Sequence, residues 1–249
     1  MIRLEGVSRT FRRAGGEPVV ALQDVTLEVR RGETLALLGP SGCGKTTTLR
    51  VMNRLLEPSG GRVLVDGQDT AAMDPVLLRR RMGYVVQRGG LFPHLTIRRN
   101  IGILCEVEGW ERARMDARVN ELLELVRLPP AEFRDRYPRE LSGGQQQRIG
   151  VARALALDPE ILLMDEPFGA LDPITRSKLQ QEFRDLEKLV SKTVVIVTHD
   201  LDEAFLLGDR VALMNGGSIV QAGTPDELKA APATPWVERF LAGMMKEAS

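Results

Sequence analysis

The chain has 249 residues, of which 43% are hydrophobic and 27% charged, a composition that excludes a disordered or fibrous protein. Lys and Arg number 34, as do Asp and Glu, and this zero net charge argues against a uniformly basic nucleic-acid-binding protein. With only two cysteines and two histidines, neither a disulfide framework nor a structural zinc site is expected.

Targeting signals are not evident in the sequence. No apolar run approaches the roughly 18–20 residues of a membrane-spanning helix, and the first residues lack the apolar region of a signal peptide. We therefore expect the chain to stay in the cytosol.

Two kinds of strand signal follow each other along the chain. Segments that alternate between apolar and polar side chains predict an antiparallel sheet, and they are residues 3–7, 19–29 and 62–65. Runs that are apolar throughout predict strands of a parallel sheet covered on both faces, and they are residues 35–38, 84–86, 161–164, 194–197 and 211–214. The segments between them have helical periodicity, so the fold class is expected to be α/β.

Helix signals replace the strand signals between about residues 91 and 157. One helical face would carry five apolar side chains, which are Met115, Val119, Leu122, Leu123 and Val126. Core packing explains this stripe better than a ligand surface does, and Pro129 and Pro130 are expected to stop the helix. The segment is interpreted as an inserted helical subdomain. Residues 221–249 are interpreted as a loop with one or two amphipathic helices.

A glycine-rich segment directly follows the apolar run at residues 35–38. It matches the strand, loop and helix pattern of a phosphate-binding P-loop, and consists of Gly39, Pro40, Ser41, Gly42, Cys43, Gly44, Lys45, Thr46 and Thr47. The backbone N–H groups would surround a triphosphate, Lys45 would reach its β- and γ-phosphates, and the Thr46 hydroxyl would bind Mg²⁺. Cys43 stands at a variable position, and its side chain is assigned no chemistry.

Two acidic residues follow the apolar run at residues 161–164. Asp165 is expected to hold Mg²⁺, and Glu166 to orient and deprotonate the attacking water. Acidic residues at strand ends are common in solvated loops, so this assignment depends on the partnership with Lys45.

A second glycine-rich segment contains Ser142, Gly143, Gly144 and Gln145. The spacing of Ser142 and Gln145 is that of a helix capping box. A capping box does not need two glycines, which would leave N–H groups uncovered as a second anion site. One chain would then have two phosphate sites. The simplest arrangement is a dimer in which each second site closes on the nucleotide of the other chain.

Together these motifs resemble the nucleotide-binding subunits of the ATP-binding-cassette (ABC) transporter family over nearly the whole chain. Residues 39–47 match the Walker A segment, 141–145 the signature and 161–166 the Walker B strand. The resemblance implies a P-loop NTPase (RecA-like) parallel sheet core with an N-terminal antiparallel β subdomain. The single ABC ATPase domain would comprise a core at 1–90 and 158–220, a helical subdomain at 91–157 and a tail at 221–249.

The resemblance also implies roles for four further residues. Gln87 matches the Q-loop glutamine that senses Mg²⁺ and the membrane partner, Asp172 the D-loop at residues 170–172, and His199 the switch histidine that contacts the γ-phosphate. With Lys45 and Glu166, Gln87 and His199 complete the expected catalytic set. The family stacks an N-terminal aromatic on adenine, for which Phe11 is the candidate, with a buried core phenylalanine as the alternative.

Several segments resemble the importer ATPases for quaternary amines such as glycine betaine, carnitine and choline. They are residues 52–58, 83–94 and 167–176, together with Trp110. The resemblance implies ATP and Mg²⁺ as cofactors, a homodimer at the cytoplasmic face of the inner membrane, membrane permease subunits and, indirectly, a substrate-binding protein. The alternatives are an importer of another polar solute, such as an amino acid or a sulfonate, and a soluble ABC ATPase acting on nucleic acid or ribosomes. The soluble ATPase would be expected to show two cassettes, a coiled-coil insertion or a basic surface.

Overall fold

The computed structural model describes residues 1–12, 17–87, 90–169 and 171–247 and, within them, all side chains except those of 187–190 and 244–247. Gly89 and Ala170, which belong to segments used in the resemblance, lie outside the described residues. The chain forms two compact units, the first from Met1–Arg79 and Thr193–Ser249 and the second from Arg80–Lys192.

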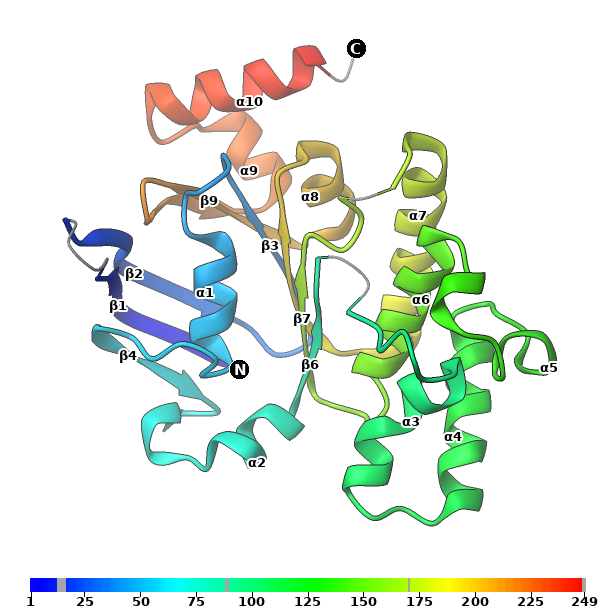
Figure 1. Ribbon diagram of the computed structural model, residues 1–249. Helices are drawn as coiled ribbons and strands as arrows, with labels where there is room; N and C mark the ends of the chain where they lie inside the picture. The colour runs from blue at the N-terminus through cyan, green and yellow to red at the C-terminus, as the bar shows by residue number, and fades with distance from the viewer. Residues whose placement is uncertain (13–16, 88–89, 170, 248–249) are drawn as a thin grey trace. The chain divides into compact units, whose positions relative to one another are not determined.

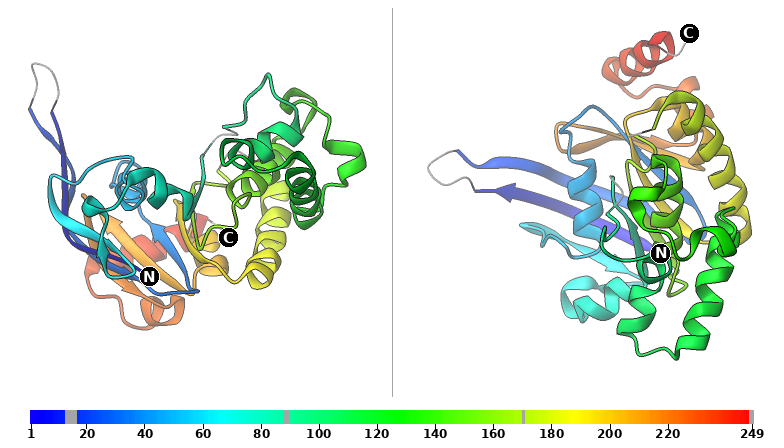
Figure 2. Two further views of the ribbon diagram at one scale, coloured as in Figure 1. Left: turned by 90° about the horizontal axis from the view of Figure 1, so that it is seen from below. Right: turned by 45° about the vertical axis from the view of Figure 1, so that its right-hand side comes forward.

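An antiparallel sheet forms one part of the first unit. Its strand order is β2-β1-β4-β5, with β1 at Ile2–Phe11, β2 at Val19–Val29, β4 at Gly60–Val65 and β5 at Gln68–Asp69. The strands β1 and β2 form a long ribbon (Figure 2). Because Ile2, Leu4 and Val7 of β1 are completely buried, the sheet has one face on the core, as the alternating pattern predicted.

Parallel strands form the centre of the first unit (Figure 1). They are β3 at Thr34–Leu38, β8 at Thr193–Thr198 and β9 at Arg210–Asn215, and β3 lies between the other two. Every residue of β3 and β8 is buried. Each fully buried Leu, Ile or Val contributes about 1.5–3 kcal/mol relative to an exposed one, so these apolar runs stabilise the platform from which the loops emerge.

The prediction for the start of the C-terminal tail is wrong. Residues 221–223, expected in a loop, belong to strand β10 at Ser218–Gly223, which pairs antiparallel with β9. The turn between the two strands contains Gly216 and Gly217, both with positive φ angles of 54° and 84°. Such a glycine pair permits a tight hairpin, so the chain returns beside β9 instead of leaving the sheet.

The helices of the first unit connect these strands. They are α1 at Lys45–Met52, the 3-10 helix η1 at Thr70–Ala72, α8 at Leu201–Leu207, α9 at Pro225–Ala230 and α10 at Pro235–Glu247, while α2 at Pro75–Arg80 ends at the unit boundary. The tail therefore contains two helices, α9 and α10. In the part of the chain that the structure describes, no helix combines the length and apolar character that crossing a membrane requires.

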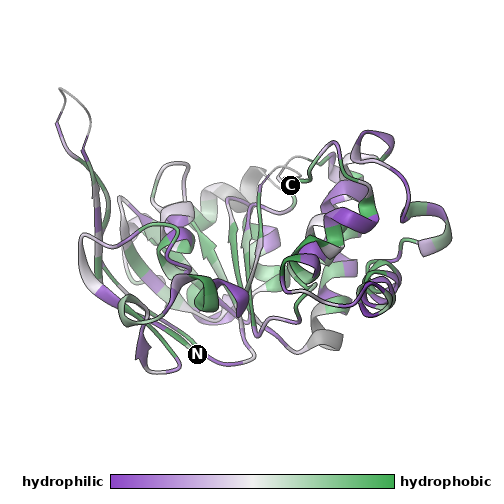
Figure 3. Cartoon of the chain, turned by 60° about the horizontal axis from the view of Figure 1, so that its bottom comes forward, coloured by the Kyte–Doolittle hydropathy of each residue, from purple (hydrophilic) through white to green (hydrophobic). Residues whose placement is uncertain are grey.

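The second unit combines two parallel strands with helices. The strands are β6 at Met82–Val85 and β7 at Ile161–Asp165. The helices are α3 at Ile97–Val107, α4 at Arg112–Leu125, α5 at Pro130–Phe133, the 3-10 helix η2 at Pro138–Glu140, α6 at Gly143–Ala154 and α7 at Pro173–Val190. Figure 3 shows hydrophobic and hydrophilic colours on these helices, as amphipathic packing requires.

The apolar stripe of α4 is core, as predicted. Met115, Val119, Leu122 and Leu123 are all buried, and so is Val126 at the helix end. The helix ends before the two prolines, because Arg127 adopts a positive φ of 58° directly after Val126. Pro130 instead begins α5, where a proline needs no N–H partner.

Candidate active site

The glycine-rich loop at residues 39–47 lies in the first unit, between β3 and α1. Two of its glycines are required by close packing. A Cβ atom at Gly39 would lie 2.2 Å from the carbonyl oxygen of Met214, and one at Gly44 would lie 2.6 Å from that of Ala21. Gly44 also has a φ of 109°, which side-chain-bearing residues rarely adopt. The loop conformation therefore requires glycine at these two positions.

Lys45 is folded back onto its own loop. Its Nζ donates to the carbonyl oxygens of Gly39 at 2.7 Å and Pro40 at 3.0 Å, and the residue is only 5% exposed. Among the described residues no carboxylate forms an ion pair with this buried ammonium group. A buried cation whose partners are two carbonyl oxygens and the Cys43 sulfur favours an anionic ligand, so Lys45 fits a bound phosphate.

The N-terminus of α1 has the same preference. Its N-cap is Gly44, so no side chain caps it, and its first turn contains no acidic residue. No side chain therefore covers this helix N-terminus, whose backbone N–H groups and dipole favour a negative charge. Together with Lys45, the backbone N–H groups at this helix N-terminus fit a nucleoside triphosphate.

Cys43 lies in this loop as a buried thiol. Its Sγ is 3.9 Å from Nζ of Lys45. Burial raises the pKa of the Cys43 thiol more than the neighbouring Lys45 lowers it. The thiol is accordingly protonated at neutral pH, which agrees with the absence of a chemical role in the sequence analysis.

Two further predicted site residues lie in the first unit. His199 directly follows the last residue of β8 and has an exposed side chain. Asp200 then caps α8 by accepting the N–H of Glu203 at 3.0 Å, which fixes the chain just after the histidine. Phe11 ends β1 half-buried, with the Arg9 guanidinium 4.9 Å from its ring centroid.

The acidic pair lies in the second unit, at the end of β7. Asp165 is the last residue of the strand and only 4% exposed, and its Oδ2 accepts the Tyr84 hydroxyl at 3.3 Å. The sequence analysis missed Tyr84 as a partner. It lies on the neighbouring strand β6, and the only available signal was that both runs ended near polar residues. Tyr84 orients the carboxylate expected to hold Mg²⁺.

Gln87 and Glu166 contact each other in the second unit. The Gln87 Nε2 donates to Oε2 of Glu166 at 2.7 Å, although the two residues are far apart in sequence. Glu166 has a positive φ of 44°, an uncommon conformation for a side-chain-bearing residue that turns the chain sharply after β7. The structure therefore brings together the glutamine and the expected general base.

The second glycine-rich segment forms the N-terminus of α6. The Ser142 Oγ accepts the Gln145 N–H at 3.3 Å, and Gln145 Oε1 accepts the Ser142 N–H at 2.9 Å. This is the capping box that the spacing predicted. At Gly144 a Cβ would lie 2.9 Å from Cγ2 of Thr175, so this glycine lets α6 approach α7, whereas Gly143 is exposed.

Asp172 caps the neighbouring helix α7. Its Oδ1 accepts the backbone N–H of Thr175 at 3.0 Å. Hydrogen bonds from Thr175 hold the pKa of the Asp172 carboxyl below its usual value. The side chain is exposed, so a negative charge is maintained near the start of α7, where the helix dipole favours it.

The predicted site residues thus form two groups, one in each unit. The first unit contains Phe11, residues 39–47 and His199, and the second contains Gln87, residues 142–145, Asp165, Glu166 and Asp172. In the described part of the chain, no cluster of three or more His, Cys, Asp or Glu side chains could hold a metal ion.

Comparison with protein families shows to which family this chain belongs. The model of the family described as "ABC transporter" matches residues 22–169. The chain belongs to the ABC transporter family. The matched segment includes the P-loop, the capping box of α6 and the acidic end of β7. The chain can therefore be compared with other members of the ABC family.

Relatives of known name are 46–52% identical to this ABC chain. The glycine betaine/carnitine/choline transport ATP-binding protein OpuCA of Bacillus subtilis is 52% identical over 97% of this chain and 62% of its own length. The osmoprotectant import ATP-binding protein OsmV of Salmonella typhimurium is 52% identical over 97% of this chain and 63% of its own length. The chain thus spans less than two thirds of these two relatives. The glycine betaine uptake system ATP-binding protein YehX of Escherichia coli is 46% identical, over 97% of this chain and 76% of its own length.

Solved structures agree with the ABC fold. A dimeric ATP-binding cassette in a post-hydrolysis state, bound to ADP and Pi, has a TM-score of 0.80 at 34% identity, covering 90% of this chain and 98% of the other. The cassette protein cbiO1 of Clostridium perfringens has a TM-score of 0.81 at 28% identity, covering 92% and 90%. The predicted fold class, an α/β P-loop core with an antiparallel β subdomain, is therefore confirmed.

Proposed function

We propose that this chain is the ATP-hydrolysing subunit of an importer for osmoprotectants such as glycine betaine, carnitine or choline. The observation that carries the ATPase assignment is the P-loop, where the buried Lys45 has no carboxylate partner among the described residues and α1 has no side-chain cap. Both features favour a polyphosphate ligand. The choice of solute is supported by the relatives OpuCA, OsmV and YehX, which are 46–52% identical and are named for the transport of osmoprotectants or glycine betaine.

The nucleotide would be held together with Mg²⁺. Mg²⁺ is usually bound through one or two protein groups together with the phosphates of the substrate and water. Thr46 supplies a hydroxyl and Asp165 a buried carboxylate of this kind, with Gln87 as a further oxygen ligand. The metal would neutralise the charge that develops on the phosphate oxygens.

Hydrolysis would use Glu166 as the general base, which takes a proton from the attacking water. Its Oε2 accepts a hydrogen bond from Gln87, which holds the carboxylate in one orientation. His199, exposed after β8, would donate to the γ-phosphate. Phe11 would stack on the adenine ring from the end of β1.

A homodimer would complete each site. Ser142 and Gly143 are exposed at the N-terminus of α6, where the phosphate of a nucleotide held by the other chain could bind. The similar solved cassette bound to ADP and Pi is dimeric, which supports this arrangement. Each chain would then supply the P-loop of one site and the signature of the other.

Permease subunits would dock near residues 91–95, at the cytoplasmic face of the inner membrane. Phe92 is 40% exposed although its backbone is fixed by Asn100, whose Oδ1 accepts the Phe92 N–H at 2.7 Å. The Arg153 guanidinium lies 5.9 Å from the Phe92 ring and donates to the Gly90 carbonyl at 2.7 Å. Burial disfavours the charged guanidinium and so lowers the pKa of Arg153. A rigidly presented aromatic ring beside a desolvated cation suits a protein interface.

The proposal is tested by reconstituting the chain with candidate permease and binding-protein subunits in liposomes. ATP-dependent uptake of radiolabelled glycine betaine, carnitine or choline is expected, and it should be lost with Glu166→Gln. Uptake of an amino acid or sulfonate instead of all three would assign a different solute. No ATPase activity in any assembly would overturn the enzymatic assignment itself.

Docking is tested in the same system with two matched substitutions. Phe92→Glu should weaken co-purification with the permease while ATPase activity of the free subunit survives, because a charge would be buried at the interface. Val107→Glu, at an apolar side chain that is 71% exposed at the end of α3, is the control and should assemble normally. Normal assembly of Phe92→Glu would place docking elsewhere.

A further inference from the structure

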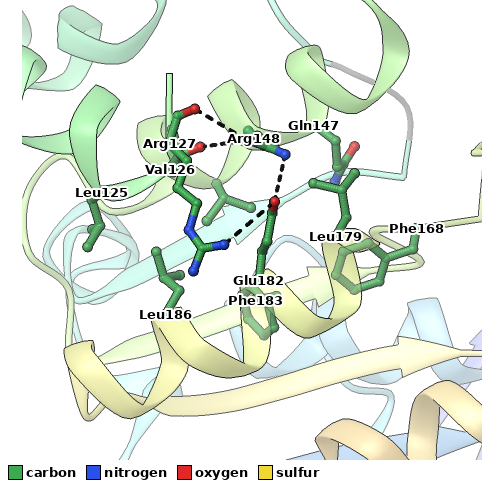
Figure 4. Close-up of a pocket in the computed structure, with 11 residues that line it drawn as sticks. Leu125, Val126, Arg127, Gln147, Arg148, Phe168, Leu179, Glu182, Phe183 and Leu186 are labelled. Atoms are coloured by element: carbon green, nitrogen blue, oxygen red, sulfur yellow. Dashed lines mark hydrogen bonds and ion pairs between the residues drawn. The ribbon is translucent and has the colours of Figure 1, made fainter. Parts of the chain in front are cut away.

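A pocket opens in the second unit between α6, α7 and the end of α4 (Figure 4). Its open volume is about 400 Å³, including solvent at the mouth, and no residue of the candidate active site lines it. The walls are mostly apolar and include Val126, Val151, Phe168, Leu179, Phe183 and Leu186. Apolar walls with a few polar groups among them are typical of sites that bind small organic molecules.

The packing of α6 on α7 explains where the pocket begins. At Gly144 the two helices are so close that a Cβ would lie 2.9 Å from Thr175 and 3.2 Å from Leu179. Further along α6, Gln147 and Val151 line open space instead. The bulky residues at the end of α4 complete the wall, so the pocket is a feature of three packed helices.

One polar group in the pocket has no partner. Gln147 is only 8% exposed, and its Nε2 is buried without a hydrogen bond among the described residues. An unpaired buried donor is costly, and most buried polar groups in proteins are paired with protein or water. Empty cavities are usually apolar throughout, so this donor indicates that an acceptor belongs in the pocket.

The charged groups at the pocket are already paired with one another. The Arg148 guanidinium lies 2.6 Å from one carboxylate oxygen of Glu182, and Arg127 lies 3.7 Å from the other. Arg127 also contacts Asp185 at 3.2 Å. Two cations and two anions balance, so a charged ligand would have to displace an existing ion pair. A neutral ligand would leave these ion pairs in place.

We propose that this pocket binds a small neutral molecule with an apolar body and one hydrogen-bond acceptor, which accepts the free N–H of Gln147 Nε2. The apolar walls would take up the body, and the amide would select for a carbonyl or ether oxygen. This site is separate from the nucleotide site, and the proposal does not depend on the transport function.

Two probes of nearly equal shape test the proposal on the whole chain. Acetophenone carries a carbonyl oxygen, whereas ethylbenzene has the same ring and chain without it. In ¹H–¹⁵N and methyl NMR titrations, acetophenone should shift the Gln147 side-chain amide saturably and bind about tenfold more tightly than ethylbenzene, as a satisfied buried donor implies. In Gln147→Leu the two affinities should become equal.

Two further measurements locate the bound probe in the pocket, and the first of them needs no substitution. Intermolecular NOEs from acetophenone should reach the methyl groups of Val151 and Leu179. Leu125→Trp, at a half-buried residue of the pocket wall, should abolish binding of both probes, whereas Val107→Trp on the exposed end of α3 should not.

Three results would overturn the proposal. Equal affinity of the two probes for the unaltered chain would mean that Gln147 selects no acceptor. NOEs to residues outside the pocket would place the probes elsewhere. Absence of any saturable shift would mean that the pocket holds water only.

Discussion

The N-termini of α1 and α6 are both expected to bind phosphate, yet the chain completes them differently. The first turn of α1 has no side-chain cap, and Lys45 beside it has no carboxylate partner among the described residues. At α6 the capping box of Ser142 and Gln145 already satisfies two backbone N–H groups. The N-terminus of α1 therefore lacks a side-chain cap, whereas the N-terminus of α6 has one.

This difference indicates a division of roles. A helix end that needs an anion gains most from binding one, so α1 is suited to hold the nucleotide tightly within one chain. A helix end that is already capped gains less and can release its ligand readily. At α6 the Ser142 oxygen accepts a bond from Gln145, which leaves its own hydrogen free to donate. Such a site suits a contact that is made and broken in each cycle.

The largest expected effect is on the hydrolysis step, and it should leave phosphate binding at both helix N-termini intact. Glu166→Gln keeps the shape and the acceptor for Gln87 but removes the base, so turnover should fall by about 10²–10⁴ while ATP binding remains. Binding without hydrolysis should trap a dimer, which size-exclusion chromatography with ATP detects. A variant that stays monomeric at high ATP, or that hydrolyses at the unaltered rate, would contradict the role of Glu166.

The second prediction tests whether the two helix ends act on one nucleotide from different chains. Lys45→Ala should abolish nucleotide binding at its own P-loop, because charge-assisted contacts contribute about 1.5–3 kcal/mol each. Ser142→Ala should bind nucleotide but hydrolyse it slowly. A mixture of the two variants should regain activity above either alone, because one intact site forms from two chains.

Concentration dependence provides the control for this mixture. The specific ATPase rate of the unaltered chain should rise with protein concentration, since dimerisation completes each site. A specific rate independent of concentration, together with no complementation, would mean that a single chain hydrolyses ATP by itself.

Local sequence patterns were enough to predict much of this comparison. The P-loop, the capping box of α6 and the apolar runs of β3 and β8 are each determined by residues close together in the chain. The fold class followed from the order of these patterns. The apolar stripe of α4 was likewise assigned to the core from its spacing alone.

Contacts between distant segments could not be predicted in the same way. The bonds from Tyr84 to Asp165 and from Gln87 to Glu166 depend on β6 lying beside β7, which periodicity does not specify. The unpaired amide of Gln147 depends on how three helices pack. Strand β10 was missed because the turn signal of Gly216 and Gly217 was not used.

A third prediction separates stability from phosphate binding at α6. Ser142→Ala removes the acceptor for the Gln145 N–H and should lower the free energy of unfolding by about 1 kcal/mol. Ser142→Asp should restore stability to within a few tenths of a kcal/mol, since Asp is an equally good N-cap. ATPase activity should nevertheless be lost, because the carboxylate repels a phosphate. Denaturant unfolding and ATPase assays on the same samples measure both. Restored activity in Ser142→Asp would mean that the serine only caps the helix.

The smallest expected effect concerns a third helix end, that of α7, where Asp172 is a charged cap. Because hydrogen bonds from Thr175 lower its pKa in the folded chain, Asp172 adds stability above its unfolded pKa, and this stability is lost as pH falls through the folded pKa. Asp172→Asn keeps an acceptor oxygen but not the charge. The unaltered chain should be slightly more stable than the variant at neutral pH, and the difference should shrink as the medium becomes acidic and the carboxylate is protonated. Thermal unfolding of both proteins across this pH range measures the difference, and ¹³C NMR titration of the Asp172 carboxyl locates its pKa. A stability difference that persists after the carboxyl is fully protonated would show that the charge of Asp172 is not what stabilises the start of α7.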